Sequence, residues 1–484
     1  MRSVRLNAQP AAARRRNDQT PNPKTGNRKW GLMVQDRIEL SRPGALLYLL
    51  RVQMELFADV SATAKQRANA GLRGDLPAQL LRFNEFGTDT QVLETEFAGA
   101  GGAKRRVATY VNEFWTAKQR AAHSLHEISY RACFKPQLPR FFIERLTSPG
   151  DTVYDPFMGR GTTPLEAALL GRVPIANDIN PLSALLLKPR LNPPRIEQVA
   201  ERLGNIPFGD AEETPEDLLV FYHPETLREI SALKQYFGRR RAAVSNGAMD
   251  NVDSWIEMVA LNRLTGHSPG FFSVYTLPPN QAASVKAQRK INADRNQKPE
   301  YRNVAAIILK KSRSLLKDLD EAAAGRLRAG AESGLFVTSP AGATPQITGG
   351  SVALAVTSPP FLNVVDYAGD NWLRCWFAGI DPGAVRITVP KKLEAWEEVM
   401  TGVLRELRRV LKPGGHVAFE VGEVSKGTVR LEESVLRCGS AVGLEPLLVL
   451  INQQDFTKTA NCWGVDNNAK GTNTNRIVLF KKGE

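Results

Sequence analysis

A predicted strand, a turn with two glycines and a predicted helix follow one another at residues 151–168, and this order restricts the fold more than any other part of the chain. The segment reads Asp-Thr-Val-Tyr-Asp-Pro-Phe-Met-Gly-Arg-Gly-Thr-Thr-Pro-Leu-Glu-Ala-Ala. Residues 153–154 predict a short buried strand, Gly159 and Gly161 turn the chain, and Thr162 begins a helix. Glycines let a backbone approach a ligand closely, and a helix N-terminus offers free N–H groups. The segment therefore predicts a ligand site at the end of a strand in an α/β sheet.

Two familiar ligand-binding loops are excluded by the residues of this turn. A dinucleotide fingerprint needs a third glycine three places after Gly161, and Pro164 stands there. A phosphate-binding loop needs Gly-Lys followed by Ser or Thr, which the turn lacks. Asp155, at the strand end, favours a ligand with a cationic or amine-bearing part. A second predicted strand ends in Asp178, close to the spacing at which an acid binds ribose hydroxyls in strand–turn–helix–strand nucleoside sites.

A second rigid corner follows the apolar run 352–356, whose Val, Ala and Leu residues predict another buried strand. The corner reads Thr-Ser-Pro-Pro-Phe at residues 357–361. Its two prolines fix their own φ angles and remove two backbone donors. What remains is a set of carbonyls, a serine hydroxyl and an aromatic ring, which suit a flat heterocycle with an amino group. The alternative is a strand-ending turn with a buried phenylalanine.

Together these residues resemble the amino-group DNA methyltransferases that use S-adenosylmethionine. The run 155–163 is similar to their cofactor motif, and the run 357–361 is similar to their catalytic motif. Cys-Phe-Lys-Pro-Gln-Leu-Pro, at residues 133–139, is similar to the family's extra cofactor-side motif. The order of the motifs resembles the class that places its target-recognition region between the two halves. The resemblance covers roughly residues 111–200 and 345–484.

The resemblance implies a fold, a cofactor and a set of site residues. The fold is a doubly wound, Rossmann-like α/β sheet with an inserted target-recognition region and an N-terminal helical extension. The implied contacts to S-adenosylmethionine come from Lys135, Pro136, Asp155, Pro156, Phe157, Gly159, Gly161, Thr162, Thr163 and Asp178. The implied catalytic residues are Ser358, Pro359, Pro360 and Phe361. A target base would be flipped out of the duplex to reach them.

The form of the catalytic motif bears on the base that is modified. Ser-Pro-Pro resembles family members that methylate N4 of cytosine, whereas Asp-Pro-Pro-Tyr is the usual form for N6 of adenine. Phe361 stands where the family usually has tyrosine, so stacking is kept and a phenolic hydrogen bond is lost. The family's acidic contact to the cofactor adenine is expected near residues 339–341, where this chain has Ser-Pro-Ala.

The distribution of charge points to a polyanionic partner. The net charge is +14, and residues 1–29 and 280–317 carry +7 and +8 of it, so the rest of the chain is near neutral. Two separate basic segments favour double-stranded DNA as the partner, although a solvated charged face is the alternative for any basic run. Within the second segment we expect DNA contacts from Lys286, Arg289, Lys290, Arg295, Lys298 and Arg302.

The expected organisation has five parts. Residues 1–29 are a basic flexible tail, and residues 30–110 are an N-terminal helical region of unknown role in which 99–102 form a linker. Residues 111–200 are the cofactor-binding part of the methyltransferase domain. Residues 201–345 are the inserted target-recognition region, and residues 346–484 are the catalytic part. Further strands are expected at 416–421, 447–452 and 476–480.

Several other functions are excluded or left open by the composition. The four cysteines show no Cys-x-x-Cys spacing and none follows a proline, which excludes the Pro-Cys nucleophile of carbon-5 cytosine methylases. No signal-like or membrane-spanning run is seen, so we expect a cytoplasmic protein that acts on nucleoid DNA in a bacterium. His123 and His126 alone do not predict a metal site.

Three alternatives to the cytosine-N4 enzyme remain open from the sequence. They are an N6-adenine DNA methyltransferase, an RNA amino-methyltransferase, and a catalytically inactive DNA-binding module of the same fold. A cognate restriction enzyme is a possible partner, while the recognition sequence and the oligomeric state are not set by the residues.

Overall fold

A computed structural model gives the fold of most of the chain. It describes residues 75–99, 102–116, 122–131, 133–212, 214–243, 249–279, 281–360, 366–385, 390, 392–424, 429–453 and 474–484. All of these lie in one compact unit, Gln66–Glu484. The predicted basic tail, most of the predicted N-terminal helical region and Phe361 lie outside the described residues. Within these ranges no helix combines the length and the apolar character needed to cross a membrane.

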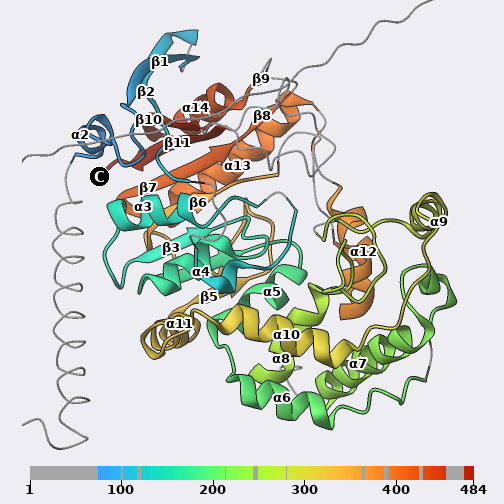
Figure 1. The fold of residues 1–484 in the computed structure, drawn as a ribbon. Coiled ribbons are helices and arrows are strands. Elements are labelled where there is room, and N and C mark those ends of the chain that lie inside the picture. The colour runs from blue at the N-terminus through green and yellow to red at the C-terminus, as the bar shows by residue number, and fades with distance from the viewer. Residues whose placement is uncertain are drawn as a thin grey trace, which may run out of the picture. The chain divides into compact units, whose positions relative to one another are not determined.

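The described residues contain a nine-stranded sheet with the order β1-β2-β10-β11-β7-β6-β3-β4-β5 (Figure 1). The five strands at one end of this order, from β7 to β5, are parallel to one another. The strands span Gln91–Ala98 (β1), Lys104–Asn112 (β2), Thr152–Asp155 (β3), Val173–Asn177 (β4), Leu335–Val337 (β5), Val352–Thr357 (β6), Leu411–Val421 (β7), Leu444–Gln453 (β10) and Thr474–Lys482 (β11). The predicted doubly wound α/β fold is confirmed.

The two strands that precede the glycine turn and the proline corner are neighbours in this sheet. Val153 of β3 pairs with Leu354 of β6, about 200 residues further along the chain. From β3 the chain moves to β4 and β5 on one side, and from β6 it moves to β7 on the other. Their carboxyl ends therefore meet where the strand order reverses, which is where ligands bind in open α/β sheets.

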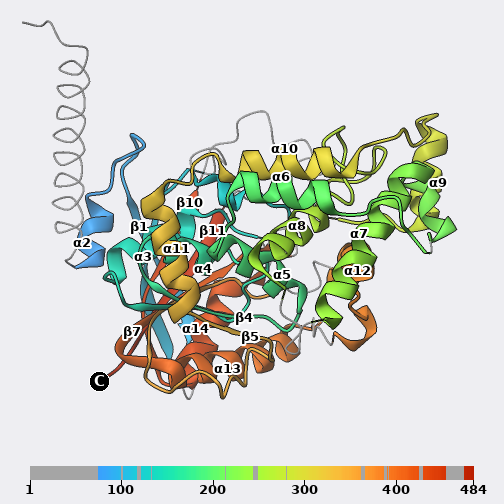
Figure 2. The ribbon, with the colours of Figure 1, turned by 90° about the horizontal axis from the view of Figure 1, so that it is seen from below.

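Helices cover both faces of the sheet because alternate strand residues are apolar on opposite sides. On one face, Val153 and Leu354 pack with α3 (Gln137–Leu146), and α4 (Thr162–Leu169) lies beside α3. On the other face, Tyr154 packs with α13 (Leu393–Val410) and α14 (Leu431–Ala441). Figure 2 shows α13 on the opposite side of the sheet from α3 and α4. Both faces of β3 and β6 are thus covered by apolar side chains, and this packing holds the ends of the two strands in place.

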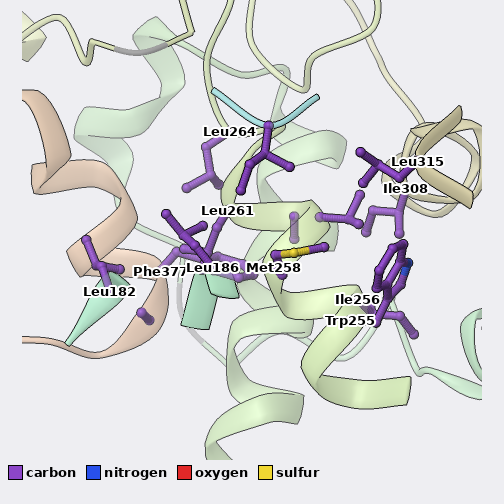
Figure 3. Packing of buried hydrophobic residues seen from close by; sticks show 14 of the residues in the cluster. Leu182, Leu186, Trp255, Ile256, Met258, Leu261, Leu264, Ile308, Leu315 and Phe377 are labelled. Atoms are coloured by element: carbon purple, nitrogen blue, oxygen red, sulfur yellow. The ribbon is translucent and has the colours of Figure 1, made fainter. Parts of the chain in front are cut away.

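A helical region stands between β4 and β5. It comprises α5 (Leu182–Leu191), α6 (Ile196–Asn205), α7 (Pro224–Ala242), α8 (Asn251–Leu261), α9 (Val285–Asp294), α10 (Val304–Leu316) and α11 (Glu321–Ser333). Helix α8 is apolar around most of its circumference and is buried among α5, α6 and α10. Figure 3 shows its Trp255 and Met258 in this core, and the Trp255 indole donates to Ser312 Oγ at 3.0 Å. Helix α12 (Tyr367–Ala378), which follows the proline corner, contributes Phe377 to the same core.

Two boundaries differ from the prediction. Residues 91–112 were expected in a helical region, but they form the β1–β2 hairpin, and β2 pairs in parallel with β10. The physical reason is the alternation at 107–110, where Val107 and Tyr110 are buried against opposite sides of the sheet. Gly99, expected in a linker, closes this hairpin through its N–H to the Ala103 carbonyl at 2.7 Å.

The second difference lies at the end of the predicted insert, 201–345. Strand β5 pairs with β4 as the last strand of the sheet, and α11 packs on α4 and α5. These elements therefore belong to the sheet and its covering layer. A three-residue strand, Leu-Phe-Val, is too short for its hydrophobic pattern to be separated from an ordinary loop in the sequence.

Candidate active site

The glycine turn leaves the end of β3 through two left-handed residues. Gly159 has φ 50° and Gly161 has φ 79°, a region that favours glycine because a Cβ would collide with the backbone. A Cβ on Gly161 would also stand 2.7 Å from Leu187 Cδ1 of α5, so only glycine lets α4 and α5 pack this closely. The turn is fastened to the neighbouring strand by the Met158 N–H, which donates to the Asn177 carbonyl at 3.0 Å.

Asp178 stands at the end of β4, facing the glycine turn. Its carboxylate accepts from the Gly159 N–H at 2.8 Å and from the Asn180 N–H at 2.9 Å. Burial raises its pKa, while these two bonds oppose that rise. Each carboxylate oxygen has a second acceptor position, so Asp178 can accept from ligand hydroxyls while it holds the turn.

Asp155 lies below the turn and joins the two motifs. Only 1% of its surface is exposed, and its Oδ1 accepts from Thr357 Oγ1 at 2.6 Å and from the Phe157 N–H at 3.0 Å. The carboxyl thus connects the end of β3 with the residue before Ser358. Burial raises the pKa of Asp155 to about 7, against the effect of these hydrogen bonds.

The raised pKa of Asp155 predicts a pH-dependent stability. Because its folded-state pKa lies above the unfolded value, the folded protein retains a proton that the unfolded chain loses between pH about 4 and 7. Stability is therefore lost as pH rises through this window, by roughly 1.4 kcal/mol per unit of pKa shift. The Asp155→Asn variant should lose less stability than wild type between pH 5 and 8 in urea unfolding.

A control for this experiment stands at the other end of the same segment. Asp151 precedes β3 and pairs with Lys412 at 3.0 Å. Asp151→Asn should leave the loss of stability between pH 5 and 8 unchanged. An Asp155→Asn curve that falls as steeply as wild type would show that this carboxyl does not titrate there.

The proline corner at the end of β6 is held by two contacts. The Trp396 indole of α13 donates to the Pro360 carbonyl at 3.0 Å, and Trp396 itself is fully buried. Ser358 lies beside Glu420 of β7, because Thr357 pairs with Phe419, and burial raises the pKa of this carboxyl while the Ser358 side chain opposes that rise. Glu420 also accepts from Asn475 Nδ2 of β11 at 3.0 Å. Ser358 lines the cavity, and its hydroxyl oxygen can accept a hydrogen bond from a ligand.

One cavity of about 310 Å³ brings the two motifs together. From the predicted cofactor residues it is lined by Pro156, Phe157, Gly159, Thr162 and Asp178, and from the predicted catalytic residues by Ser358 and Pro360. Its remaining wall includes Tyr130, Arg131, Cys133 and Phe134, which precede α3, and Tyr367 of α12. The cavity thus spans the ends of β3, β4 and β6.

Six predicted residues do not line this cavity. Asp155, Gly161 and Thr163 support it from below, and the Thr163 hydroxyl donates to the Val356 carbonyl of β6 at 3.1 Å. Pro136 precedes the first residue of α3, and Lys135 is half-buried with a pKa lowered first by burial. Pro359 is buried. Phe361 lies outside the described residues, so its stacking role stays a prediction.

Sequence reasoning missed several cavity residues. Residues 130–134 gave no chemical signal beyond the extra motif, and Tyr367, nine residues after Ser358, belongs to none of the motifs. Pro340 and Ala341, where an acid was expected, do line the cavity. Glu420 could have been found, because a lone acid in the apolar strand 416–421 is costly to bury without a function or a partner.

The predicted DNA contacts fall on and after α9. Lys286, Arg289 and Lys290 are exposed on this helix, although Arg289 lies 3.4 Å from Asp217. Lys298 is exposed, and the Arg295 guanidinium lies 3.7 Å from the centroid of the Tyr275 ring. Arg302 differs from the rest. Its guanidinium donates to three backbone carbonyls of residues 268–273, so it holds a loop in place. We therefore no longer expect Arg302 to contact DNA.

The fold and the cavity define a class: a doubly wound α/β protein with a site shared by a glycine turn and a proline corner at the sheet's reversal point. A family model described as DNA methylase (N6_N4_Mtase) matches residues 65–184. These residues include the β1–β2 hairpin, the extra motif and the glycine turn. Over these residues the chain is thus similar to the amino-group DNA methyltransferases.

Two curated relatives agree with this assignment. The chain is 26% identical over 287 residues to the type II methyltransferase M.BsoBI of Geobacillus stearothermophilus, covering 54% of this chain and 54% of M.BsoBI. It is 35% identical over 81 residues to the type II methyltransferase M.MjaII of Methanocaldococcus jannaschii, covering 17% of this chain and 15% of M.MjaII. The chain thus spans about half the length of M.BsoBI and a smaller part of M.MjaII.

Solved structures are more distantly similar. An rRNA methylase from Streptococcus thermophilus matches 73% of this chain and 99% of its own, with 10% identity and a TM-score of 0.28. A geranyl diphosphate methyltransferase in complex with GPP and sinefungin matches 72% of this chain and 78% of its own, with 9% identity and a TM-score of 0.29.

Proposed function

We propose that this protein is a site-specific DNA methyltransferase that transfers a methyl group from S-adenosylmethionine to the exocyclic amine of a flipped base, N4 of cytosine. The single observation that carries the proposal is the shared cavity, in which Gly159 and Asp178 face Ser358 and Pro360. A glycine turn with a strand-end acid and a proline corner with a serine acceptor are the two halves that such a transfer needs in one place.

The residues on the cofactor side suit S-adenosylmethionine. The Gly159 backbone, at φ 50° and without a side chain, allows close approach of a ligand. The Asp178 carboxylate can accept from ribose hydroxyls, and Phe157 and Pro340 supply apolar surface for a purine. When bound, this cofactor supplies an electrophilic methyl group on a sulfonium.

The catalytic corner would act on the amine by orientation. An exocyclic amine of cytosine is a weak nucleophile because its lone pair is delocalised into the ring. Ser358 Oγ, which lines the cavity, would accept one amine hydrogen and favour a tetrahedral nitrogen. A prolyl carbonyl of the corner would accept the other. The buried contacts of Trp396 and Glu420 fix these acceptors, so that little reorganisation is needed during transfer.

The direct test is mass spectrometry of nucleosides from DNA incubated with the purified protein and methyl-labelled S-adenosylmethionine. Label in N4-methylcytosine is the expected result. Label in N6-methyladenine would keep the methyltransferase and overturn the assigned base. Label in RNA alone, or in no base at all, would overturn the proposed DNA methyltransferase in favour of an RNA methylase or an inactive binding module.

The proposed partner is double-stranded DNA, held in part by the cations on α9. Replacing Lys286, Arg289 and Lys290 by alanine should weaken DNA binding at least tenfold at physiological salt. The slope of log affinity against log salt should become shallower by about 0.9 for each phosphate that the variant no longer neutralises. Fluorescence anisotropy with a DNA duplex at several salt concentrations measures both quantities.

A control removes the same charge elsewhere. Arg82 is exposed at the end of α2 (Leu76–Leu81), Lys104 is exposed on β2, and Arg328 is exposed on α11. All three lie away from α9. Their triple alanine variant should keep the wild-type salt slope. Equal losses of affinity in both triple variants would show that only net charge matters and that α9 is no particular DNA-binding surface.

A cognate restriction enzyme stays part of the proposal, because the curated relatives are type II methyltransferases.

A further inference from the structure

A buried arginine stands between the two glycines of the turn. Arg160 is 5% exposed, and its side chain reaches the cavity wall 128–134, of which the structure describes residues 128–131, 133 and 134. Its Nη1 donates to the carbonyls of Ile128 at 2.7 Å and His126 at 3.3 Å. Its Nη2 donates to the Phe134 carbonyl at 3.4 Å. One guanidinium thus holds both ends of this wall.

A second arginine holds Arg160 itself. Arg190 of α5 is fully buried and donates to the Arg160 carbonyl, and also to the Leu125 carbonyl at 3.2 Å. Burying two guanidiniums side by side is costly unless their donors are satisfied. Among the described residues, the hydrogen bonds of both go to backbone carbonyls and to the Thr162 hydroxyl, at 3.2 Å from Arg160 Nε. A pair of buried cations whose hydrogen bonds go almost entirely to backbone carbonyls has the character of a positioning device.

The wall that Arg160 holds supplies Tyr130, Arg131, Cys133 and Phe134 to the cavity. Its other side is tied to the helix after the catalytic corner. Arg131 pairs with Asp370 of α12 at 3.0 Å, and Arg374 of α12 donates to the Ser129 carbonyl at 3.1 Å. The wall therefore lies between the glycine turn and α12, and Arg160 joins it to the turn.

We propose that Arg160 is a positioning residue of the cofactor site, which sets the width of the cavity between the glycine turn and the wall 128–134. This inference rests on the proposed function, since it concerns the affinity of that site for S-adenosylmethionine and its product. Arg160 lines no part of the cavity, so it acts through the backbone of the wall. Without it, three buried carbonyls lose a donor and the wall can move away from Gly159.

The experiment compares Arg160 with a matched buried arginine. Arg172 is 8% exposed and donates to the carbonyls of Leu170 at 2.6 Å and Thr147 at 2.9 Å, before the start of β4 and away from the cavity. Arg160→Met, Arg160→Lys and Arg172→Met are prepared in the full chain. The affinity for S-adenosylhomocysteine is measured by titration calorimetry, beside the melting temperature and the turnover at saturating cofactor.

Arg160→Met should raise the Kd for S-adenosylhomocysteine about tenfold or more, with turnover at saturating cofactor reduced much less. Arg160→Lys should give an intermediate Kd, because an ammonium cannot reach all three carbonyls as a planar fork does. Arg172→Met should lower the melting temperature as much as Arg160→Met does and leave the Kd unchanged. If Arg160→Met fails to fold, the lysine variant decides by the same comparison.

Two results would overturn the inference. One is a wild-type Kd in folded Arg160 variants. The other is a Kd that rises equally in Arg160→Met and Arg172→Met, which would show that Arg160 contributes only to the stability of the fold. A wild-type protein that does not bind S-adenosylhomocysteine at all would overturn the proposed function first, and this inference with it, so the two failures are distinguishable.

Discussion

Ser358→Ala is expected to lower methyl transfer about a hundredfold or more while the affinity for S-adenosylmethionine stays close to that of wild type. The physical reason is the position of its hydroxyl. Ser358 lines the cavity, where its Oγ can accept a hydrogen bond, and alanine offers no acceptor. A positioned acceptor that acts on the reacting nitrogen contributes to the rate and hardly at all to cofactor binding. Single-turnover transfer to DNA and titration calorimetry with the cofactor measure the two effects separately.

The loss should be separated from any effect on folding. Removing the hydroxyl also takes away a polar neighbour of the buried Glu420 carboxyl, so some loss of stability is expected. Ser351 stands before the start of β6 and donates its hydroxyl to the Thr348 carbonyl, so Ser351→Ala serves as the control. Wild-type turnover in folded Ser358→Ala would sink the assignment of the proline corner as the catalytic site.

Gly161→Ala should have the second large effect, on the site and on stability together. The new Cβ meets Leu187 at 2.7 Å, and the residue is held at φ 79° by the start of α4. Left-handed strain of about 1–2 kcal/mol and overpacking of about 1–3 kcal/mol are both expected. Since α4 must shift, the turn moves with it, and we expect cofactor affinity to fall at least tenfold.

A matching variant at Gly150 separates the effect of backbone strain from the effect of a steric clash. It has φ 85°, and an added Cβ would meet nothing within 4 Å. Gly150→Ala should therefore lose stability through backbone strain alone and keep its cofactor affinity. Chemical unfolding and calorimetric titration of both variants make the comparison. Equal cofactor affinities in the two alanine variants would argue against Gly161 as a determinant of the site.

Much of this fold could be predicted where local pattern and tertiary structure agree. The strands at 352–356, 416–421, 447–452 and 476–480 are each dominated by apolar residues, and each lies in the central sheet. The glycine turn could be located because left-handed backbone and close packing leave few other residues possible at Gly159 and Gly161. At these positions the residue type follows directly from one local requirement, either burial in a strand or a left-handed backbone.

The remaining features depend on distant partners that a single sequence does not display. The β1–β2 hairpin was hidden because its outer strand is mostly exposed and carries no buried alternation. From the sequence alone, Arg302 is predicted to be a free cation. Only the structure shows that its guanidinium bonds the loop 268–273. Likewise, Glu420 becomes informative only when β7 is placed beside β6, which brings its carboxylate under Ser358.

The helical region between β4 and β5 leaves the sheet at one strand and returns at the adjacent strand. Its two ends are therefore anchored at nearly the same place, while the cavity is built by β3, β4 and β6 on the other side of that junction. Under the proposed function, this arrangement separates the helices that would recognise the target from the residues that would transfer the methyl group. A lineage could exchange most of the helices for others and acquire a new target, with the chemistry of the sheet's reversal point left untouched.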